Sequence, residues 1–439
     1  MRKVPFHLPL FALIALFLAF SAPAFADSGA SSDGGYFDDG SDSYSGDEYS
    51  EDDSDDGYYD EDTSDEDYSE DSDYSDEDPV FGLIRSGTLD EIKGGLTEKK
   101  DADGNTLLMV ACMAGRDKDI VSYLLGVGSP VDARNVSGET ALMLAAEYAP
   151  SLDVVEFLVK QGAKVNSVSD NGLTPLMYAV KNESMDIAKW LMKNGADVTA
   201  RAEERNSVLC HACDNPNVTA EFIASLLKAG LDVNEANTSG RTPFMAAASA
   251  IPSTSIVEAL IKAGGKVNGA DEYGTTPLMG ACSDNSEPEI VGLLIKAGAA
   301  VNAADDANYT PLLYSIYNEN ASIIAPILLK AGAKARVTGN DGANPLIMAA
   351  WYGRMDLLQT FLDSGVPINA IDDEGKTALM YACEVTDVYD PIDLLIKAGA
   401  DASVIDESGK SAYDYASDNS AISDDEDLLA RLKGPLKAL

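Results

Sequence analysis

The sequence predicts an all-α solenoid, in which helix-turn-helix units with projecting β-turn loops stack one on the next. The first observation is a small polar residue, able to start a helix, that recurs every 33 to 35 residues. The second is a large-then-small apolar pattern behind each of these residues, and the third is a glycine near the end of most units. A unit this short cannot bury its apolar face alone, so neighbouring units must cover it. The aligned positions are Thr106, Thr140, Thr174, Ser207, Thr242, Thr276, Thr310, Asn344, Thr377 and Ser411.

The first helix of each unit is predicted from its start and its apolar face. Thr, Ser and Asn cap helices, and Pro at the next position has the backbone angle that a first helical residue needs. Two residues after the cap comes a large apolar side chain, such as Leu142 or Leu278, and three residues later a small one, such as Ala145 or Ala281. Large and small residues on one face favour close stacking. Pro follows the cap at Pro175, Pro243, Pro277, Pro311 and Pro345.

The second helix is predicted to end at glycine, which tolerates the left-handed conformation of a helix terminus. A lysine two residues earlier faces the negative end of the helix. After the glycine, an extended stretch leads into a turn, as in residues 267–274. That projecting turn argues against tetratricopeptide units, which share the same period. The glycines include Gly162, Gly230, Gly298 and Gly332, and the lysines are Lys160, Lys193, Lys228, Lys262, Lys296, Lys330 and Lys397.

These features resemble the ankyrin repeat family. The resemblance is carried by GLTPLMYA at 172–179, GTTPLMGA at 274–281 and LLIKAGAAVN at 293–302, and it covers residues 79–439. It implies antiparallel helix pairs in a stacked array, with partners meeting the turn tips and the exposed surface of the first helices. Methionine often replaces the histidine of the family's TPLH motif, as at Met177, so we expect apolar packing where the family has a polar tie.

We divide this region into nine repeats at 103–407, an N-terminal cap at 79–102 and a C-terminal cap at 408–439. Asp78 and Pro79 should cap and start the first helix. One unit departs from the pattern, because Arg205 stands where the turn glycine belongs and no proline follows Ser207. We therefore expect a local irregularity in the stack there.

The N-terminus predicts export. Residues 1–26 combine Arg2 and Lys3, an apolar run from Leu8 to Phe20, and a small-residue ending typical of a cleaved signal peptide. The run is shorter than the ~20 residues of a membrane-spanning helix. We expect a protein that lies in a periplasm or outside the cell and does not insert into a membrane.

Residues 27–78 hold 24 Asp or Glu and no Lys or Arg, which predicts a disordered acidic segment. The whole chain has a formal net charge of −43. This charge excludes nucleic acid as an expected partner, because phosphate recognition needs clustered Lys and Arg. A partial calcium-loop pattern at Asp52, Ser54 and Asp56 fails at its twelfth position, which is Thr63 rather than Glu.

Nothing in the sequence predicts an enzyme, a cofactor or a metal site. Four of the five cysteines fall in one packing register, six residues after the cap, so we expect free thiols rather than disulfides. Cys210, His211 and Cys213 form one cluster, but a second Cys or His pair that would complete a zinc site is missing. Only one histidine follows the predicted signal, which argues against most catalytic triads.

The sequence therefore predicts a noncatalytic, monomeric scaffold that binds a protein partner of basic character. Aromatic residues anchor many interfaces, and they gather with carboxylates between residues 273 and 373. An alternative is an acidic surface or spacer protein whose polyanionic segment binds cations or cationic partners. The candidate partner-binding residues are Tyr273, Tyr309, Tyr317, Trp351, Tyr352, Glu272, Asp306 and Asp341.

Overall fold

The computed structural model describes residues 78–94 and 96–433. All described residues belong to one compact unit. The predicted signal peptide and the predicted acidic segment, apart from Asp78, lie outside the described residues. Among the described helices, none is long and apolar enough to cross a membrane.

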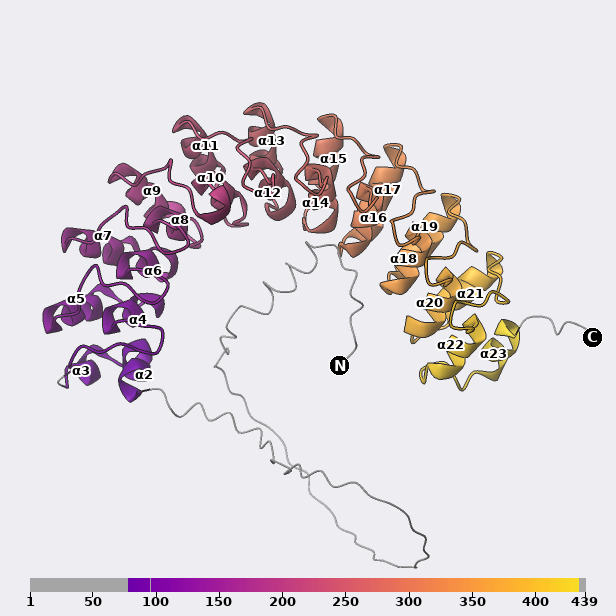
Figure 1. Cartoon of the computed structure of the whole chain (residues 1–439), viewed down its shortest axis with the longest axis horizontal. Helices are drawn as coiled ribbons and strands as arrows, with labels where there is room; N and C mark the ends of the chain where they lie inside the picture. Colours follow the sequence, from indigo (N-terminus) through magenta and orange to yellow (C-terminus); the bar gives the residue numbers. More distant parts are fainter. Residues whose placement is uncertain (1–77, 95, 434–439) are drawn as a thin grey trace, which may run out of the picture. The chain divides into compact units, whose positions relative to one another are not determined.

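The described residues form successive helix pairs, which Figure 1 shows side by side along the chain. No strand occurs among them, only three isolated β-bridges at the bases of turns. The first helices are α2 (Pro79–Ser86), α4 (Leu107–Met113), α6 (Ala141–Tyr148), α8 (Pro175–Ala179), α10 (Val208–Cys213), α12 (Pro243–Ala250), α14 (Pro277–Ser283), α16 (Pro311–Tyr314) with η3 (Ser315–Tyr317), α18 (Pro345–Trp351), α20 (Ala378–Val385) and α22 (Ala412–Asp418). The second helices are α3 (Leu89–Ile92), α5 (Lys118–Val127), α7 (Leu152–Lys160), α9 (Met185–Lys193), α11 (Ala220–Lys228), α13 (Thr254–Lys262), α15 (Glu289–Lys296), α17 (Ala321–Lys330), α19 (Leu358–Asp363) after η4 (Met355–Leu357), α21 (Asp390–Lys397) and α23 (Glu426–Leu432).

The all-α solenoid is confirmed. Each first helix packs on the first helix of the next unit and on its own second helix. The predicted large and small positions, such as Leu142 with Ala145 and Leu278 with Ala281, are almost wholly buried. The core is therefore a continuous layer between neighbouring units, and no unit has a core of its own.

The first helices begin as predicted, and the methionines accept hydrogen bonds in addition to packing. The hydroxyl of each cap threonine except Thr310 accepts the N–H three residues on, while Asp78 caps α2 ahead of Pro79. In five units the thioether Sδ of the methionine also accepts the backbone N–H of the cap threonine, at 3.3 to 3.5 Å. Apolar packing alone was the expectation. A buried sulfur instead takes the place that Glu has in a capping box, in Thr106–Met109, Thr140–Met143, Thr242–Met245, Thr276–Met279 and Thr377–Met380.

A repeated asparagine clamps five of the units to the next. After α15, for example, Asn302 Nδ2 donates to the Gly332 carbonyl oxygen at 2.9 Å, and Asn302 Oδ1 accepts the Lys334 N–H at 2.8 Å. The amide thus bonds the carbonyl of the glycine that follows the second helix, and an N–H of the loop behind it, both in the following unit. The same two bonds are made by Asn166, Asn234, Asn268 and Asn369, each eight residues before a cap.

The projecting turns form a second ladder between units. One backbone N–H of each turn donates to a carbonyl of the preceding turn, as from Glu272 to Ser239 at 2.9 Å. Glycine occupies the left-handed position of most turns, such as Gly172 and Gly274. Two turns lack this glycine. Asn308 takes φ 62° in one of them, and in the other Arg205 takes φ 64° and its neighbour Glu204 takes φ 57°.

The irregularity expected near Arg205 is confirmed. Glu204 and Arg205 both take a left-handed backbone conformation. In addition, helix α8 makes much less contact with α10 than α4 makes with α6, and α9 makes little contact with α11. Thr199 stands at the clamp position of this joint, and its hydroxyl bonds Asp197 of its own loop at 2.7 Å. A threonine side chain is too short to make both clamp bonds, so this joint lacks the clamp.

Removing the clamp at one joint and adding a clamp at another should change the free energy of unfolding in opposite directions. We expect Asn302→Ala to lower the free energy of unfolding by about 1–2 kcal/mol, because two inter-unit hydrogen bonds are lost. Thr199→Asn should raise it by about 1 kcal/mol by adding a clamp. Urea unfolding followed by circular dichroism measures both. Ser403→Ala is the matched control, because Ser403 has the same position but bonds only Asp401 of its own loop. Equal unfolding midpoints for Asn302→Ala and this control would contradict the clamp.

Arg205→Gly should stabilise the protein by about 1 kcal/mol, because a non-glycine residue is strained at positive φ. Gly172→Ala should destabilise it, since Gly172 has φ 76° and an added Cβ would lie 3.0 Å from the Ala202 backbone. Thermal unfolding measures both changes. A lower midpoint for Arg205→Gly would mean that the arginine side chain stabilises this turn more than its backbone strain destabilises it.

Candidate partner-binding face

Six aromatic side chains form a continuous column along the first helices from α16 to α20. We call Tyr309, Tyr314, Tyr317, Tyr352, Trp351 and Tyr381 the aromatic column. In that order, successive ring centroids lie 6.0, 6.5, 5.0, 5.3 and 5.3 Å apart. The first three contacts are edge-to-face and the last two are stacked, which are the favoured aromatic geometries.

The column follows from two positions in the repeat. Tyr314 and Tyr381 come four residues after their caps, and Tyr317 and Trp351 come seven residues after theirs. Positions four and seven are three residues apart and therefore share one face of a helix. Stacking of the units then brings these faces into line.

Carboxylates in the turns hold the tyrosines in place. Tyr314 donates its hydroxyl to Asp305 at 2.6 Å, and Tyr381 donates to Asp372 at 2.7 Å. The other oxygen of each aspartate accepts backbone N–H groups of the turn, such as that of Tyr309 on Asp305 at 2.7 Å. Each aspartate thus ties its turn to its first helix. The Tyr309 hydroxyl reaches the next unit instead, donating to Asp341 at 2.8 Å.

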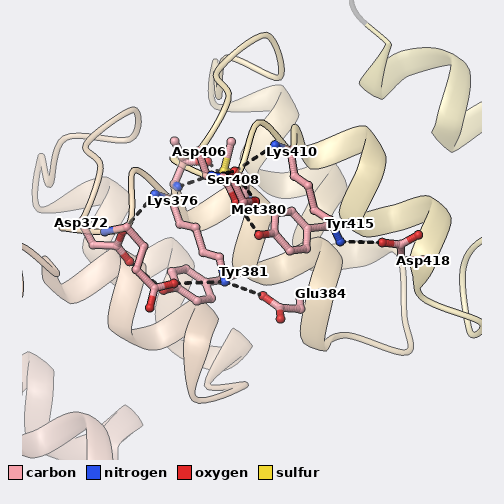
Figure 2. Close-up of polar contacts among 12 residues, drawn as sticks. Asp372, Lys376, Met380, Tyr381, Glu384, Asp406, Ser408, Lys410, Tyr415 and Asp418 are labelled. Carbon is pink, nitrogen blue, oxygen red and sulfur yellow. Dashed lines mark hydrogen bonds and ion pairs between the residues drawn. The ribbon is translucent and has the colours of Figure 1, made fainter. Parts of the chain in front are cut away.

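Two lysines continue the column into the C-terminal unit, as Figure 2 shows. Lys376 Nζ lies 4.9 Å from the ring centroid of Tyr381 and 5.0 Å from that of Tyr415, so the ammonium sits between two rings. Lys410 Nζ lies 5.3 Å from the Tyr415 centroid. Glu384 at 3.3 Å and Asp418 at 2.8 Å neutralise Lys376 and Lys410 respectively. The half-buried Lys376 and the exposed Lys410 therefore support the rings, with their charges already paired.

Burial, followed by the adjacent carboxylates, raises the pKa of the Tyr309, Tyr314 and Tyr381 phenols well above its ordinary value. The three hydroxyls stay neutral donors at all physiological pH. Among the described residues, the buried Tyr317 hydroxyl has no hydrogen-bond partner.

The rim of the column is acidic. Exposed carboxylates stand on the turn tips and at the ends of the first helices of the same units, and Lys376 and Lys410 are already paired with carboxylates. The face therefore offers aromatic surface inside and negative charge around it. Beyond the carboxylates that pair with these two lysines, the exposed acidic residues are Glu272, Asp284, Asp306, Glu319 and Asp373.

A family model described as ankyrin repeats in three copies matches residues 83–169, 108–202, 209–305, 285–372 and 346–429. The chain belongs to the ankyrin repeat family. Ankyrin repeats generally mediate protein–protein interactions and are typically noncatalytic scaffolds. No curated protein matches the chain.

Five of the eight residues predicted to bind a partner lie together in this ankyrin array. They are Tyr309, Tyr317, Trp351, Tyr352 and Asp341. Tyr317, Trp351 and Tyr352 are partly exposed members of the aromatic column. Tyr309 also belongs to it but is only 7% exposed, so with its partner Asp341 it supports the column from below.

The other three predicted residues stand on the turn tips. Tyr273 is 41% exposed beside the exposed Glu272, and the Asp306 N–H donates to the Tyr273 carbonyl oxygen at 3.0 Å. They form the acidic rim rather than the column.

Sequence reasoning missed Tyr314, Tyr381 and Tyr415, together with the lysine supports. A signal was present, because each tyrosine lies four residues after a cap and nine residues after the aspartate that holds it. The lysine supports directly precede the caps Thr377 and Ser411. The Asp-to-Tyr spacing could have been found in the sequence, whereas the contact of Lys376 with Tyr415 of the next unit could not.

The cysteine and histidine cluster lies inside the stack. All five cysteines are free and buried, and burial raises the pKa of the Cys210 thiol to about 12. Burial, and then the nearby Lys181, lower the pKa of His211 to about 4. Across the described ranges, no group of three or more His, Cys, Asp or Glu side chains could hold a metal ion. The thiols are protonated and inert at neutral pH.

The C-terminal end of the ankyrin array should weaken in acid through Asp406. Burial raises the pKa of this carboxyl, but bonds from Tyr415, Ser408 and the Lys410 N–H outweigh it and lower the pKa from 3.8 to about 2. A lowered folded-state pKa stabilises the protein above pH 4, and that contribution disappears as the pH falls through 2. Thermal midpoints measured from pH 5 to pH 2 should therefore fall less steeply for Asp406→Asn than for the unchanged protein.

Tyr415→Phe serves as the second variant in this titration. It keeps the carboxylate but removes one donor, so its acid dependence should be intermediate. Three superimposable pH profiles would show that Asp406 does not couple protonation to folding.

Proposed function

We propose that this protein is a noncatalytic scaffold that binds a partner of basic character on the aromatic column and its acidic rim. The observation that carries the proposal is the joining of six aromatic rings on adjacent first helices, surrounded by exposed carboxylates. Tyr and Trp dominate the energetics of many interfaces. Carboxylates around them attract and orient a cationic surface.

The rigidity of the column also supports this function. The aspartate bonds and ring contacts fix the side chains before any partner arrives, so little conformational entropy remains to be lost on binding. A partner side chain with a positive charge, above all arginine, could stack on Tyr352 or Trp351 and pair with a rim carboxylate. We further propose, from the N-terminal residues alone, that binding takes place after export.

Reversing the charge of the rim should abolish capture of a basic partner. We expect the triple variant Glu272→Lys, Asp306→Lys and Asp373→Lys to lose the proteins that the unchanged chain captures from native extract, identified by mass spectrometry. All three side chains are exposed on turn tips, so folding should be preserved and circular dichroism verifies it. Trp351→Ala should weaken capture without any change of charge.

The matched control reverses three turn-tip carboxylates at the other end of the array, with Asp103→Lys, Asp170→Lys and Glu203→Lys. It makes the same change in net charge and should retain every partner. Identical capture by the two triple variants and the unchanged protein would overturn the proposed face. Deleting residues 27–78 tests the alternative, because loss of all capture would assign binding to the acidic segment.

A further inference from the structure

A second charged surface, opposite in sign, lies on the second helices of the same units. Lys262, Lys296 and Lys330 are the last residues of α13, α15 and α17, and Lys266 and Lys334 follow in the loops behind them. We call these five residues the lysine edge. All five are exposed. The helices α13, α15 and α17 pack side by side, so the edge is continuous across three units.

The lysine edge is almost free of compensating charge. Lys262 lies 3.8 Å from Glu258, whereas no described carboxylate lies within ion-pair distance of the other four. The loops 263–270, 297–304 and 331–338 contain no Asp or Glu. In a chain with a formal net charge of −43, a carboxylate-free stretch of this kind is a distinct local environment.

The favourable interaction of a lysine with the end of its own helix explains only some of these five lysines. A lysine at the last helical residue interacts favourably with the helix dipole, which accounts for Lys262, Lys296 and Lys330. Lys266 and Lys334 lie beyond the left-handed glycines Gly264 and Gly332, outside the helices. Their side chains add charge to the same edge without serving a helix terminus.

We propose that the lysine edge binds an extended acidic polypeptide segment of a partner. Packed helices lie about 8–10 Å apart, and an extended chain advances about 10 Å in three residues. An acidic residue at every third position would therefore meet one lysine cluster after another. The residues of the edge are flexible ammonium groups without interleaved aromatics, which suits diffuse charge pairing better than recognition of a shaped ligand.

The net negative charge of the chain does not forbid this binding. At physiological ionic strength, charges are screened beyond about 8 Å. Because the loops 263–270, 297–304 and 331–338 contain no Asp or Glu, the lysines are the nearest charges that these loops offer to a peptide on the edge. With the aromatic face on the first helices, the scaffold would then hold a basic and an acidic partner at once.

The test uses the full chain and a labelled peptide of about twelve residues with Glu at every third position, which is long enough to span the edge. Fluorescence anisotropy should show binding that weakens as salt rises. The variant Lys266→Glu, Lys296→Glu, Lys330→Glu and Lys334→Glu should lose at least about tenfold in affinity, because four attractive charges become repulsive. A peptide of equal composition with its glutamates clustered at one end should bind more weakly.

The control reverses four exposed lysines elsewhere, with Lys93→Glu, Lys100→Glu, Lys118→Glu and Lys181→Glu, and should bind the peptide as the unchanged chain does. Equal loss in both quadruple variants would overturn the proposal, because net charge alone would then explain it. If the peptide binds only after residues 27–78 are deleted, the lysine edge binds the acidic segment of its own chain rather than a partner. Attachment through the same lysines to phosphatidylserine vesicles, without peptide binding, would assign it to an anionic lipid surface. Either result would overturn the partner proposal.

Discussion

Register between neighbouring units is the constraint on which the rest of this structure depends. No unit buries its apolar residues alone, so a shift of one unit against the next would expose core and break the column of side chains on its surface. The asparagine clamp fixes that register because one amide both donates to and accepts from the following unit. Where arginine replaces it, Arg336 Nε still reaches the Gly365 carbonyl oxygen at 3.0 Å, and Pro367 has no N–H for a second bond.

The same register creates the candidate binding face. Ring contacts such as Tyr317 with Tyr352, and Trp351 with Tyr381, join side chains of different units, so they exist only when the units are correctly stacked. The turn aspartates couple this face to the scaffold, since their two oxygens serve the turn and the first helix. Stability and surface geometry are therefore maintained by one set of contacts, and a repeat that loosened would also lose its part of the face.

Most of the fold was predictable from local chemistry. Cap residues, proline at the first helical position and glycine at left-handed positions each act within a few residues, so the sequence reveals them directly. Arg205 was likewise recognisable as a misfit in the period. The thioether bond of Met279 was not, because methionine is rarely a hydrogen-bond acceptor and only the capped geometry places its sulfur beside the Thr276 N–H. The site was predicted in part, since aromatic residues could be counted but their burial could not.

The sequence by itself determined the repeat, the stacking of helix pairs, the ankyrin family and the concentration of aromatic and acidic residues near the C-terminal half. Tertiary structure decided which of those residues form a surface. Tyr309 became a buried support, Tyr381 and Lys376 joined the column, and the lysines after α13 to α17 aligned into one edge. The reason is physical: periodicity fixes which face of a helix a residue occupies, whereas neighbours about 34 residues away decide whether that face is covered.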